Sequence, residues 1–187
     1  MTRIVAGTLG GRRIAAPPGA GTRPTSDRVR EALFSAVQAG IDLVGARFAD
    51  LYAGSGAVGL EALSRGAEHV LLVESDPRAA RVIRENVAVL RAAPAARLVT
   101  GKVAGVLAAG PDGEPYDVVF ADPPYAVPDA EITALLASLV AYDWLAPDAL
   151  VVVERSSRTG PVGWVEGITA ERGRRYGETT LWYGRRS

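Results

Sequence analysis

Acidic residues stand at the ends of three apolar runs in this sequence. Asp50 follows Phe48-Ala49, Glu74 follows the run 70–73, and Asp122 follows the run 118–121. Short runs rich in Val, Leu and Phe predict buried strands, so each carboxylate is expected at a strand end. A carboxylate there can attract a cation or accept hydrogen bonds from hydroxyl groups and amines.

A glycine-rich segment follows the first of these carboxylates. Gly54-Ser55-Gly56-Ala57-Val58-Gly59 has the G-x-G-x-x-G spacing of dinucleotide-binding turns. An NAD site has its glycine turn directly at the strand end, whereas Asp50 stands four residues before the first glycine here. That carboxylate would repel a diphosphate and attract a cation such as S-adenosylmethionine, which has a sulfonium and an amino group. The alternative is a strand–helix turn whose glycines serve only packing.

Glu74 occupies the position at which such folds bind ribose. A carboxylate at the end of the second strand, about 20 residues beyond the glycine turn, accepts hydrogen bonds from ribose hydroxyls. Asp76-Pro77 instead predicts the cap and first residue of a helix. The alternative for Glu74 is a surface residue at a strand end, without a ligand.

The segment Asp122-Pro123-Pro124-Tyr125 decides between these interpretations. Two prolines cannot extend a central strand, so they predict a rigid loop that holds one carboxylate and one aromatic ring. An exocyclic base amine is a poor nucleophile because its lone pair is delocalised into the ring. Asp122 and a backbone carbonyl can accept hydrogen bonds from the two N–H groups of such an amine, and Tyr125 can stack on the base. The alternative is a proline-rich loop in which Asp and Tyr occur by accident.

Alternating strands and helices are predicted to position these residues. Strands are predicted at 47–51, 69–74, 97–100, 117–121 and 149–154, and helices at 56–65, 77–92 and 129–141, with a weaker one near 102–109. Repeated βα units predict a mostly parallel, doubly wound, Rossmann-like sheet. The segments 163–169 and 178–184 are β-like and joined only by a Gly/Arg turn, so they predict an antiparallel hairpin that completes seven strands.

The N-terminal region is predicted to be an appendage of this sheet. Residues 2–15 contain Gly10-Gly11 between two β-prone runs, which predicts a hairpin. A Pro/Gly-rich linker follows at 16–24, and Thr25, Ser26 and Asp27 offer caps for a helix that ends near Gly40. We therefore expect a basic hairpin and linker at 1–24 and a catalytic domain at 25–187.

Charge is distributed unevenly along the chain. Residues 1–30 carry six arginines against Asp27 alone, residues 31–170 carry ten basic and eighteen acidic residues, and residues 171–187 carry five arginines against two glutamates. Basic ends suggest contact with a polyanion, although solvated surface arginine gives the same pattern. With no cysteine, a single histidine (His69) and no long apolar run, we expect a cytoplasmic protein without a metal site or membrane span.

Taken together, these segments resemble the class I amino-methyltransferases. Over nearly the whole chain the sequence resembles the bacterial (RsmD-like) family that methylates N2 of a guanine in 16S ribosomal RNA. The specific likeness is N-terminal and lies in Arg3-Ile4-Val5-Ala6-Gly7, Gly10-Gly11-Arg12, Arg23-Pro24-Thr25 and the segment Asp27–Phe34, followed by Gly59–Gly66. Asp-Pro-Pro-Tyr alone also fits adenine-N6 enzymes.

The resemblance implies a site and its ligands. The S-adenosyl-L-methionine site would be lined by Asp50, Ala53, Gly54, Ser55, Gly56, Glu74 and Ser75, and the base site by Asp122, Pro123, Pro124 and Tyr125. The RNA-binding residues would be Arg3, Arg12, Arg13, Arg23, Arg28 and Arg30. The expected partner is 16S ribosomal RNA, naked or in a small-subunit particle, bound by a monomer. The open alternatives are an amino-methyltransferase for adenine N6 or protein glutamine, and an RNA-binding module with a vestigial cofactor pocket.

Overall fold

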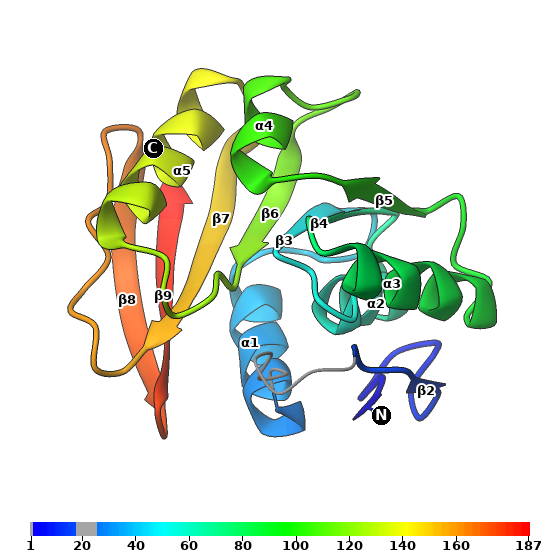
Figure 1. Ribbon diagram of the computed structural model, residues 1–187. Coiled ribbons are helices and arrows are strands. Elements are labelled where there is room, and N and C mark those ends of the chain that lie inside the picture. Colours follow the sequence, from blue (N-terminus) through cyan, green and yellow to red (C-terminus); the bar gives the residue numbers. More distant parts are fainter. Residues whose placement is uncertain (1, 18–25) are drawn as a thin grey trace.

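The apolar runs of the sequence form the strands of one seven-stranded sheet. The computed structural model describes residues 2–17 and 26–187, and its strand order is β5-β4-β3-β6-β7-β9-β8 (Figure 1). Strands β3 to β7 pair in parallel, and β9 pairs antiparallel with both β7 and β8. The predicted doubly wound sheet with an antiparallel C-terminal hairpin is confirmed.

The elements follow one another as repeated βα units. The strands of the sheet are β3 (Arg47–Leu51), β4 (His69–Glu74), β5 (Ala96–Thr100), β6 (Tyr116–Ala121), β7 (Leu145–Ser156), β8 (Ile168–Tyr176) and β9 (Thr179–Arg186). The helices are α1 (Asp27–Gly40), α2 (Ala57–Ser64), α3 (Pro77–Val89), α4 (Val103–Ala108) and α5 (Asp129–Ala141). The predicted caps are confirmed: the Ser26 hydroxyl accepts the N–H of Val29, and the Asp76 carboxylate accepts that of Arg78.

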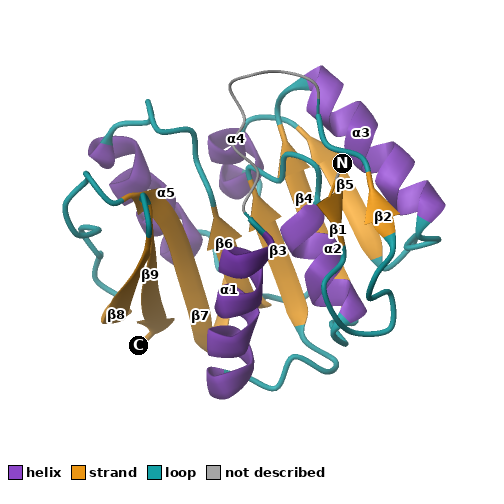
Figure 2. Ribbon diagram, turned by 90° about the horizontal axis from the view of Figure 1, so that it is seen from below, coloured by secondary structure: helices purple, strands orange, loops and turns teal. Residues whose placement is uncertain are grey.

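Helices cover both faces of the sheet (Figure 2). α1, α2 and α3 pack on one face around Phe48 and Phe120, while α4 and α5 pack on the other around Leu51 and Val119. Because successive strand residues point to opposite faces, a strand covered on both sides is apolar throughout, which explains the continuous runs in the sequence. Among residues 2–17 and 26–187, no helix is long and apolar enough to cross a bilayer.

The predicted N-terminal hairpin is present and is joined closely to the helices. β1 (Thr2–Arg3) pairs antiparallel with β2 (Arg13–Ile14). Ile4 and Ile14 are buried in the core under α1 and α2. The fully buried Glu61 carboxylate of α2 accepts the backbone N–H groups of Val5 and Ala6 at 2.8 and 3.0 Å. The hairpin is therefore part of the hydrophobic core. Most of the linker predicted at 16–24 lies outside the described residues.

The C-terminal strands differ from the prediction. The strand predicted at 163–169 is mostly a loop, and β8 begins only at Ile168 and runs through the segment predicted as a Gly/Arg turn. The turn lies at Gly177, which has a φ of 61°. The error has a physical reason: residues 171–175 of β8 are all exposed, so this edge strand lacks the apolar alternation on which strand prediction depends. Gly173 is small because the Trp182 ring packs where a Cβ would lie.

Candidate cofactor and base-binding site

Four strand ends meet at one edge of the sheet. Leu51 lies opposite both Val73 and Ala121, and Ala121 lies opposite Val153. The acidic residues next to these four positions are Asp50, Glu74, Asp122 and Glu154. The sheet therefore brings together the three strand-end carboxylates that the sequence predicts separately. Sequence analysis missed Glu154, although it too follows an apolar run, 150–153.

The glycine loop between β3 and α2 turns sharply beside this edge. Gly54 and Gly56 have φ angles of 60° and 83°, and even Tyr52 has a φ of 60°, a left-handed conformation that glycine adopts without strain. A Cβ at Gly54 would meet no atom within 4 Å. The glycine is thus required by the backbone conformation, and the space beside it is open to a ligand at the start of α2.

Asp50 is buried and holds the start of α2 against β3. Its carboxylate accepts the N–H of Gly59 at 2.9 Å, and a Cβ at Gly59 would approach Leu72 to 2.4 Å, so only glycine permits this close packing. Burial raises the pKa of Asp50 well above its ordinary value; the Gly59 hydrogen bond lowers it, and the Glu74 and Glu154 carboxylates raise it further. This carboxyl group is costly to ionise until a cation lies near it.

The Glu74 carboxylate accepts hydrogen bonds from the backbone of the glycine loop and of the segment that leads into α3. One carboxylate oxygen accepts the N–H of Gly54 at 2.8 Å, and the other accepts that of Asp76 at 2.9 Å. Ser75, between them in sequence, is exposed. A carboxylate has about four acceptor positions, so Glu74 retains acceptor capacity for ribose hydroxyls while it fixes the glycine loop.

The loop that begins at Asp122 forms the other side of the site. Asp122 is half-buried and Pro123 is buried, whereas Pro124 is exposed and Tyr125 has 53% of its surface exposed. The N–H of Val127 donates to the Pro124 carbonyl at 3.0 Å and closes a turn. The loop therefore combines a carboxylate at the sheet edge with an exposed aromatic ring that a planar base can contact.

Arg155, at the end of β7, anchors this loop. Its guanidinium donates to the Val127 carbonyl and to the Asp129 carboxylate, both at 3.0 Å, and the residue is 4% exposed. The other terminal nitrogen of Arg155 is buried without a hydrogen-bond partner among the described residues. Sequence analysis missed Arg155 because a charged residue after an apolar run is normally expected in solvent.

Comparisons with known proteins identify the family of this chain. The family model described as Conserved hypothetical protein 95 matches residues 2–185. The chain belongs to this family. It is 40% identical over 166 residues to ribosomal RNA small subunit methyltransferase D of Escherichia coli strain K12, a match that covers 87% of this chain and 80% of that protein.

Solved structures agree with the family assignment. The Escherichia coli protein yhhF gives a TM-score of 0.85 at 34% identity and covers 100% of this chain and 98% of its own. The magnesium protoporphyrin IX methyltransferase of Synechocystis PCC 6803, solved with bound SAM, gives a TM-score of 0.65 at 15% identity and covers 86% and 79%. At that identity the likeness shows only the fold, which is that of class I methyltransferases.

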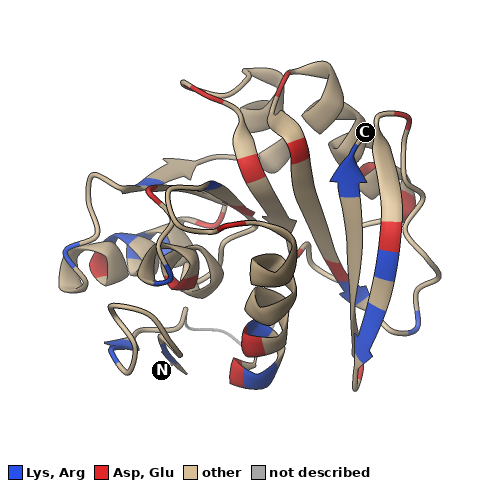
Figure 3. Ribbon diagram, turned by 180° about the vertical axis from the view of Figure 1, so that it is seen from behind, with Lys and Arg blue, Asp and Glu red and all other residues tan. Residues whose placement is uncertain are grey.

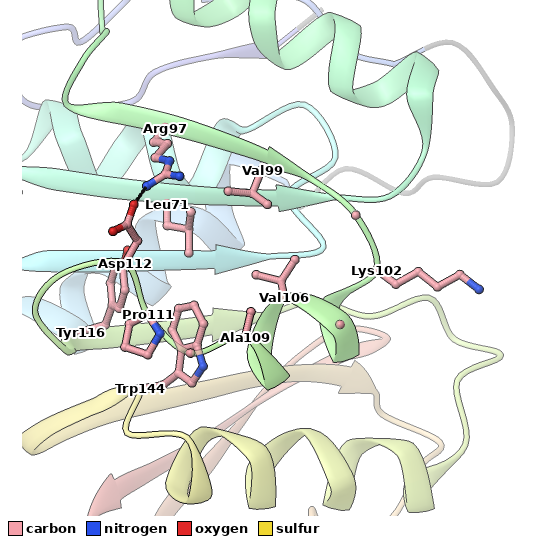
Figure 4. Close-up of a pocket in the computed structure, with 13 residues that line it drawn as sticks. Leu71, Arg97, Val99, Lys102, Val106, Ala109, Pro111, Asp112, Tyr116 and Trp144 are labelled. Atoms are coloured by element: carbon pink, nitrogen blue, oxygen red, sulfur yellow. Dashed lines mark hydrogen bonds and ion pairs between the residues drawn. The ribbon is translucent and has the colours of Figure 1, made fainter.

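A second groove reaches the site at Gly101, whose N–H donates to the Glu74 carbonyl at 3.0 Å. It has a volume of about 600 Å³ and runs beside α4, between β4, β5 and the segment 109–112, where Arg97 pairs with Asp112 (Figure 4). Trp144 lines the groove and donates its indole N–H to the Leu107 carbonyl at 2.8 Å. Gly101 and Lys102, directly after β5, line one end. None of the four strand-end carboxylates lines this groove.

The predicted RNA-binding arginines differ in exposure. Arg3, Arg12, Arg13 and Arg28 are exposed on the hairpin and at the start of α1. Arg3 and Arg13 line a hollow of about 480 Å³ together with Asp27, which pairs with Arg3 at 3.4 Å. Arg12 donates to the Val89 carbonyl at 3.0 Å. Arg23 lies outside the described residues.

Arg30 is not on the surface. It is fully buried, pairs with Glu61 at 3.3 Å and with Asp27 at 2.9 Å, and also donates to the Arg3 carbonyl. These contacts join α1, α2 and the hairpin, so we assign Arg30 a structural role and do not include it among the RNA contacts. The sequence suggested otherwise because helix spacing does not reveal that a charged side chain points toward a buried carboxylate.

His69 lies at the opposite end of β4 from the site. Its Nε2 is 3.0 Å from the Tyr116 hydroxyl, and burial and the nearby Arg47 and Arg97 charges lower its pKa. This environment indicates a structural role for His69. Within residues 2–17 and 26–187, no group of three or more His, Asp and Glu side chains gathers in a way that could hold a metal ion.

Proposed function

We propose that this protein transfers a methyl group from S-adenosyl-L-methionine to the exocyclic N2 of a guanine in 16S ribosomal RNA. The observation that carries the proposal is the convergence of Asp50, Glu74 and the Asp122–Tyr125 loop at one sheet edge. A cation site, a ribose acceptor and an amine acceptor are then adjacent. The name of the Escherichia coli relative, a small-subunit ribosomal RNA methyltransferase, supports ribosomal RNA as the substrate.

The cofactor site fits the chemistry of S-adenosylmethionine. The open space beside Gly54 and the positive φ of the loop let backbone approach a ligand closely. The buried Asp50 carboxyl would ionise when a cation lies near it and would then attract that cation. Glu74 and Ser75 would contact the ribose and Ala53 to Gly56 the amino-acid part. When bound, the cofactor supplies a methyl group on a sulfonium sulfur, which is a good leaving group.

The base site supplies position and electrostatics. Asp122 would accept an N–H of the amine and direct the nitrogen lone pair at the methyl carbon, while Tyr125 stacks on the ring. The N–C bond forms as the C–S bond breaks, with the bonding pair going to sulfur. The methylated amine then loses a proton to Asp122 or to water. A base can reach Tyr125 only when it is unstacked from its neighbours.

Nucleoside analysis tests the proposal directly. The enzyme would be incubated with labelled S-adenosylmethionine and small ribosomal subunits that lack the modification, and with naked 16S ribosomal RNA. We expect label in N2-methylguanosine from at least one substrate. Label in N6-methyladenosine or in a ribosomal protein would preserve the methyl transfer and overturn the target. Cofactor binding without transfer to any RNA or protein would favour a non-catalytic RNA-binding module.

A further inference from the structure

The strand β8 carries three exposed arginines in four residues. Arg172, Arg174 and Arg175 follow Glu171, which pairs with Arg185 on β9 at 2.9 Å. The Arg172 guanidinium lies 5.2 Å from the ring centroid of Tyr183. Residues 171–187 contain five arginines and two glutamates, so this end of the sheet is basic. Figure 3 shows the basic residues along β8.

The strand register relates these arginines to the base-binding loop. Ala121, the residue before Asp122, lies opposite Val153 of β7. Glu154, which follows Val153, lies opposite Leu181 of β9. Leu181 in turn lies opposite Arg174. Arg174 is therefore at the level at which the loop leaves the sheet.

Arg172 and Arg174 lie on the face that carries α1, because their register partners Tyr183 and Leu181 belong to that core. Arg175 points to the other face of this edge strand and donates to the Gly177 carbonyl at 2.9 Å.

The N-terminal hairpin lies on the other side of α1. In Figure 1 the β1–β2 hairpin and the tip of the β8–β9 hairpin both lie toward the lower side of the molecule, with α1 between them. Figure 2 shows the same order from below. The two basic hairpins thus lie on either side of α1. In the sequence, the acidic middle of the chain separates them.

We propose that Arg172, Arg174 and Arg175 bind phosphates of the same RNA, on the opposite side of the target base from the N-terminal hairpin. This inference rests on the proposed function. Extracting a base from its stack costs a few kcal/mol, and contacts to the backbone on both flanks hold the RNA while the base is unstacked. Arginine suits phosphate because its planar guanidinium donates two parallel hydrogen bonds.

Charged residues on an edge strand have another use, which the test must separate from RNA binding. They prevent edge-to-edge pairing between molecules. If that were their only role, neutral substitution would promote self-association and leave RNA affinity unchanged. The test variant is Arg172→Gln/Arg174→Gln/Arg175→Gln. A second variant, Arg174→Gln/Arg175→Gln, keeps the Arg172–Tyr183 contact in case the triple variant folds poorly.

The control removes equal charge from the other end of the sheet. Arg81→Gln/Arg84→Gln/Arg97→Gln changes three exposed arginines on α3 and β5. For wild type and variants we would measure binding of transcribed 16S ribosomal RNA at several salt concentrations, methyl transfer to unmodified small subunits, and affinity for S-adenosylmethionine. Light scattering would report self-association.

The β8 triple variant should bind RNA about tenfold or more weakly near physiological salt, with its KM for the subunit raised similarly. The slope of the logarithm of RNA affinity against the logarithm of salt concentration should be shallower by about 2 to 3, at roughly 0.7–0.9 per lost phosphate contact. Affinity for S-adenosylmethionine should stay within twofold of the wild-type value. Unchanged RNA binding, or an equal loss in the control, overturns this inference. If the wild-type protein binds RNA but transfers no methyl group, the proposed function is overturned, and the binding comparison between the variants still tests this inference. If the wild-type protein binds no RNA, the proposed function and this inference are both overturned.

Discussion

The carboxylates of the candidate site differ in how far each is removed from water. Asp50 is 1% exposed and Glu154 is 7% exposed, while Glu74 and Asp122 are half-buried. Burial makes the Asp50 carboxyl costly to ionise, and this carboxyl accepts a hydrogen bond inside the protein, whereas a half-buried carboxylate keeps a face toward ligands. Substitutions at Asp50 and Asp122 should therefore affect different measured quantities.

Replacing Asp122 should affect the catalytic rate. We expect Asp122→Ala to fold, to bind S-adenosylmethionine normally and to lose about 10²–10³-fold in kcat, the scale for one preorganised electrostatic group. The hydrogen bonds from the amine strengthen as positive charge develops on nitrogen, so the loss falls on the transition state. Single-turnover kinetics with saturating RNA would measure it. Asp122→Asn, which keeps an acceptor oxygen, is the control, and normal turnover in Asp122→Ala would exclude this mechanism.

Replacing Asp50 should change how stability and cofactor affinity depend on pH. Burial raises the pKa of Asp50 above the ordinary value of 3.8, so the folded state holds this proton more tightly than the unfolded state does. Its contribution to stability is present below the unfolded pKa and is lost as pH rises through the folded pKa. The difference in Tm between Asp50→Asn and wild type should therefore shift in favour of the variant with rising pH above about 4.

The same variant should bind S-adenosylmethionine more weakly, because the neutral amide cannot attract a cation. Calorimetry at two pH values checks this, and thermal scans across the acid-to-neutral range check the stability trend. A Tm difference that stays constant with pH would show that Asp50 does not titrate with a raised pKa.

At the scale of elements, the proposed base-binding loop depends on a strand to which it is not adjacent in sequence. Arg155 of β7 contacts the Val127 carbonyl and Asp129, so it acts as a positioning residue. Arg155→Met should lower kcat about tenfold or more, because small displacements of a reacting group are costly, and should leave cofactor affinity unchanged. Partial rescue in Arg155→Lys, which restores one donor, would separate positioning from packing. Loss of cofactor affinity in step with the rate would indicate a general structural defect.

The sequence predicts the elements whose signals are local. The strand ends at Asp50, Glu74 and Asp122 are recognisable because an apolar run stops at a carboxylate, and the Asp76-Pro77 helix start is a local signal too. Arg30 and Arg155 were not predictable in the same way, since each is buried by residues distant in sequence: Glu61 lies on α2, and Val127 follows β6. The limits of β8 were missed for the complementary reason, because an exposed edge strand has no buried face to give a pattern.

At the scale of the whole molecule, the N-terminal hairpin and the sheet form one body. Ile4 and Ile14 belong to the core, and Glu61 accepts hydrogen bonds from both the hairpin backbone and Arg30. Deleting the hairpin would leave a buried carboxylate and guanidinium with fewer partners, which is strongly destabilising. The role of the hairpin in RNA binding is therefore better tested by substitutions on its surface than by truncation.

Neutralising the exposed hairpin arginines should weaken RNA binding selectively. We expect Arg3→Gln/Arg12→Gln/Arg13→Gln to raise the KM for the ribosomal substrate and to flatten the salt dependence by roughly 0.7–0.9 per lost phosphate contact. Affinity for S-adenosylmethionine should not change, because these residues lie outside the sheet edge. Filter binding over a salt series makes the measurement. An unaltered salt slope would assign the hairpin a purely structural role.

The tryptophans have a consequence for spectroscopy. Trp182 packs over Gly173 and Trp164 over Gly184, and Trp144 lies at the groove beside α4. All three tryptophans follow residue 143 in the chain, so indole emission comes from the half of the molecule built by α5 and the C-terminal strands. Detachment of the hairpin from α2 would be nearly invisible to intrinsic fluorescence. If the chain first opened at its N-terminal end, a fluorescence melting curve would therefore report a later transition than hydrogen exchange.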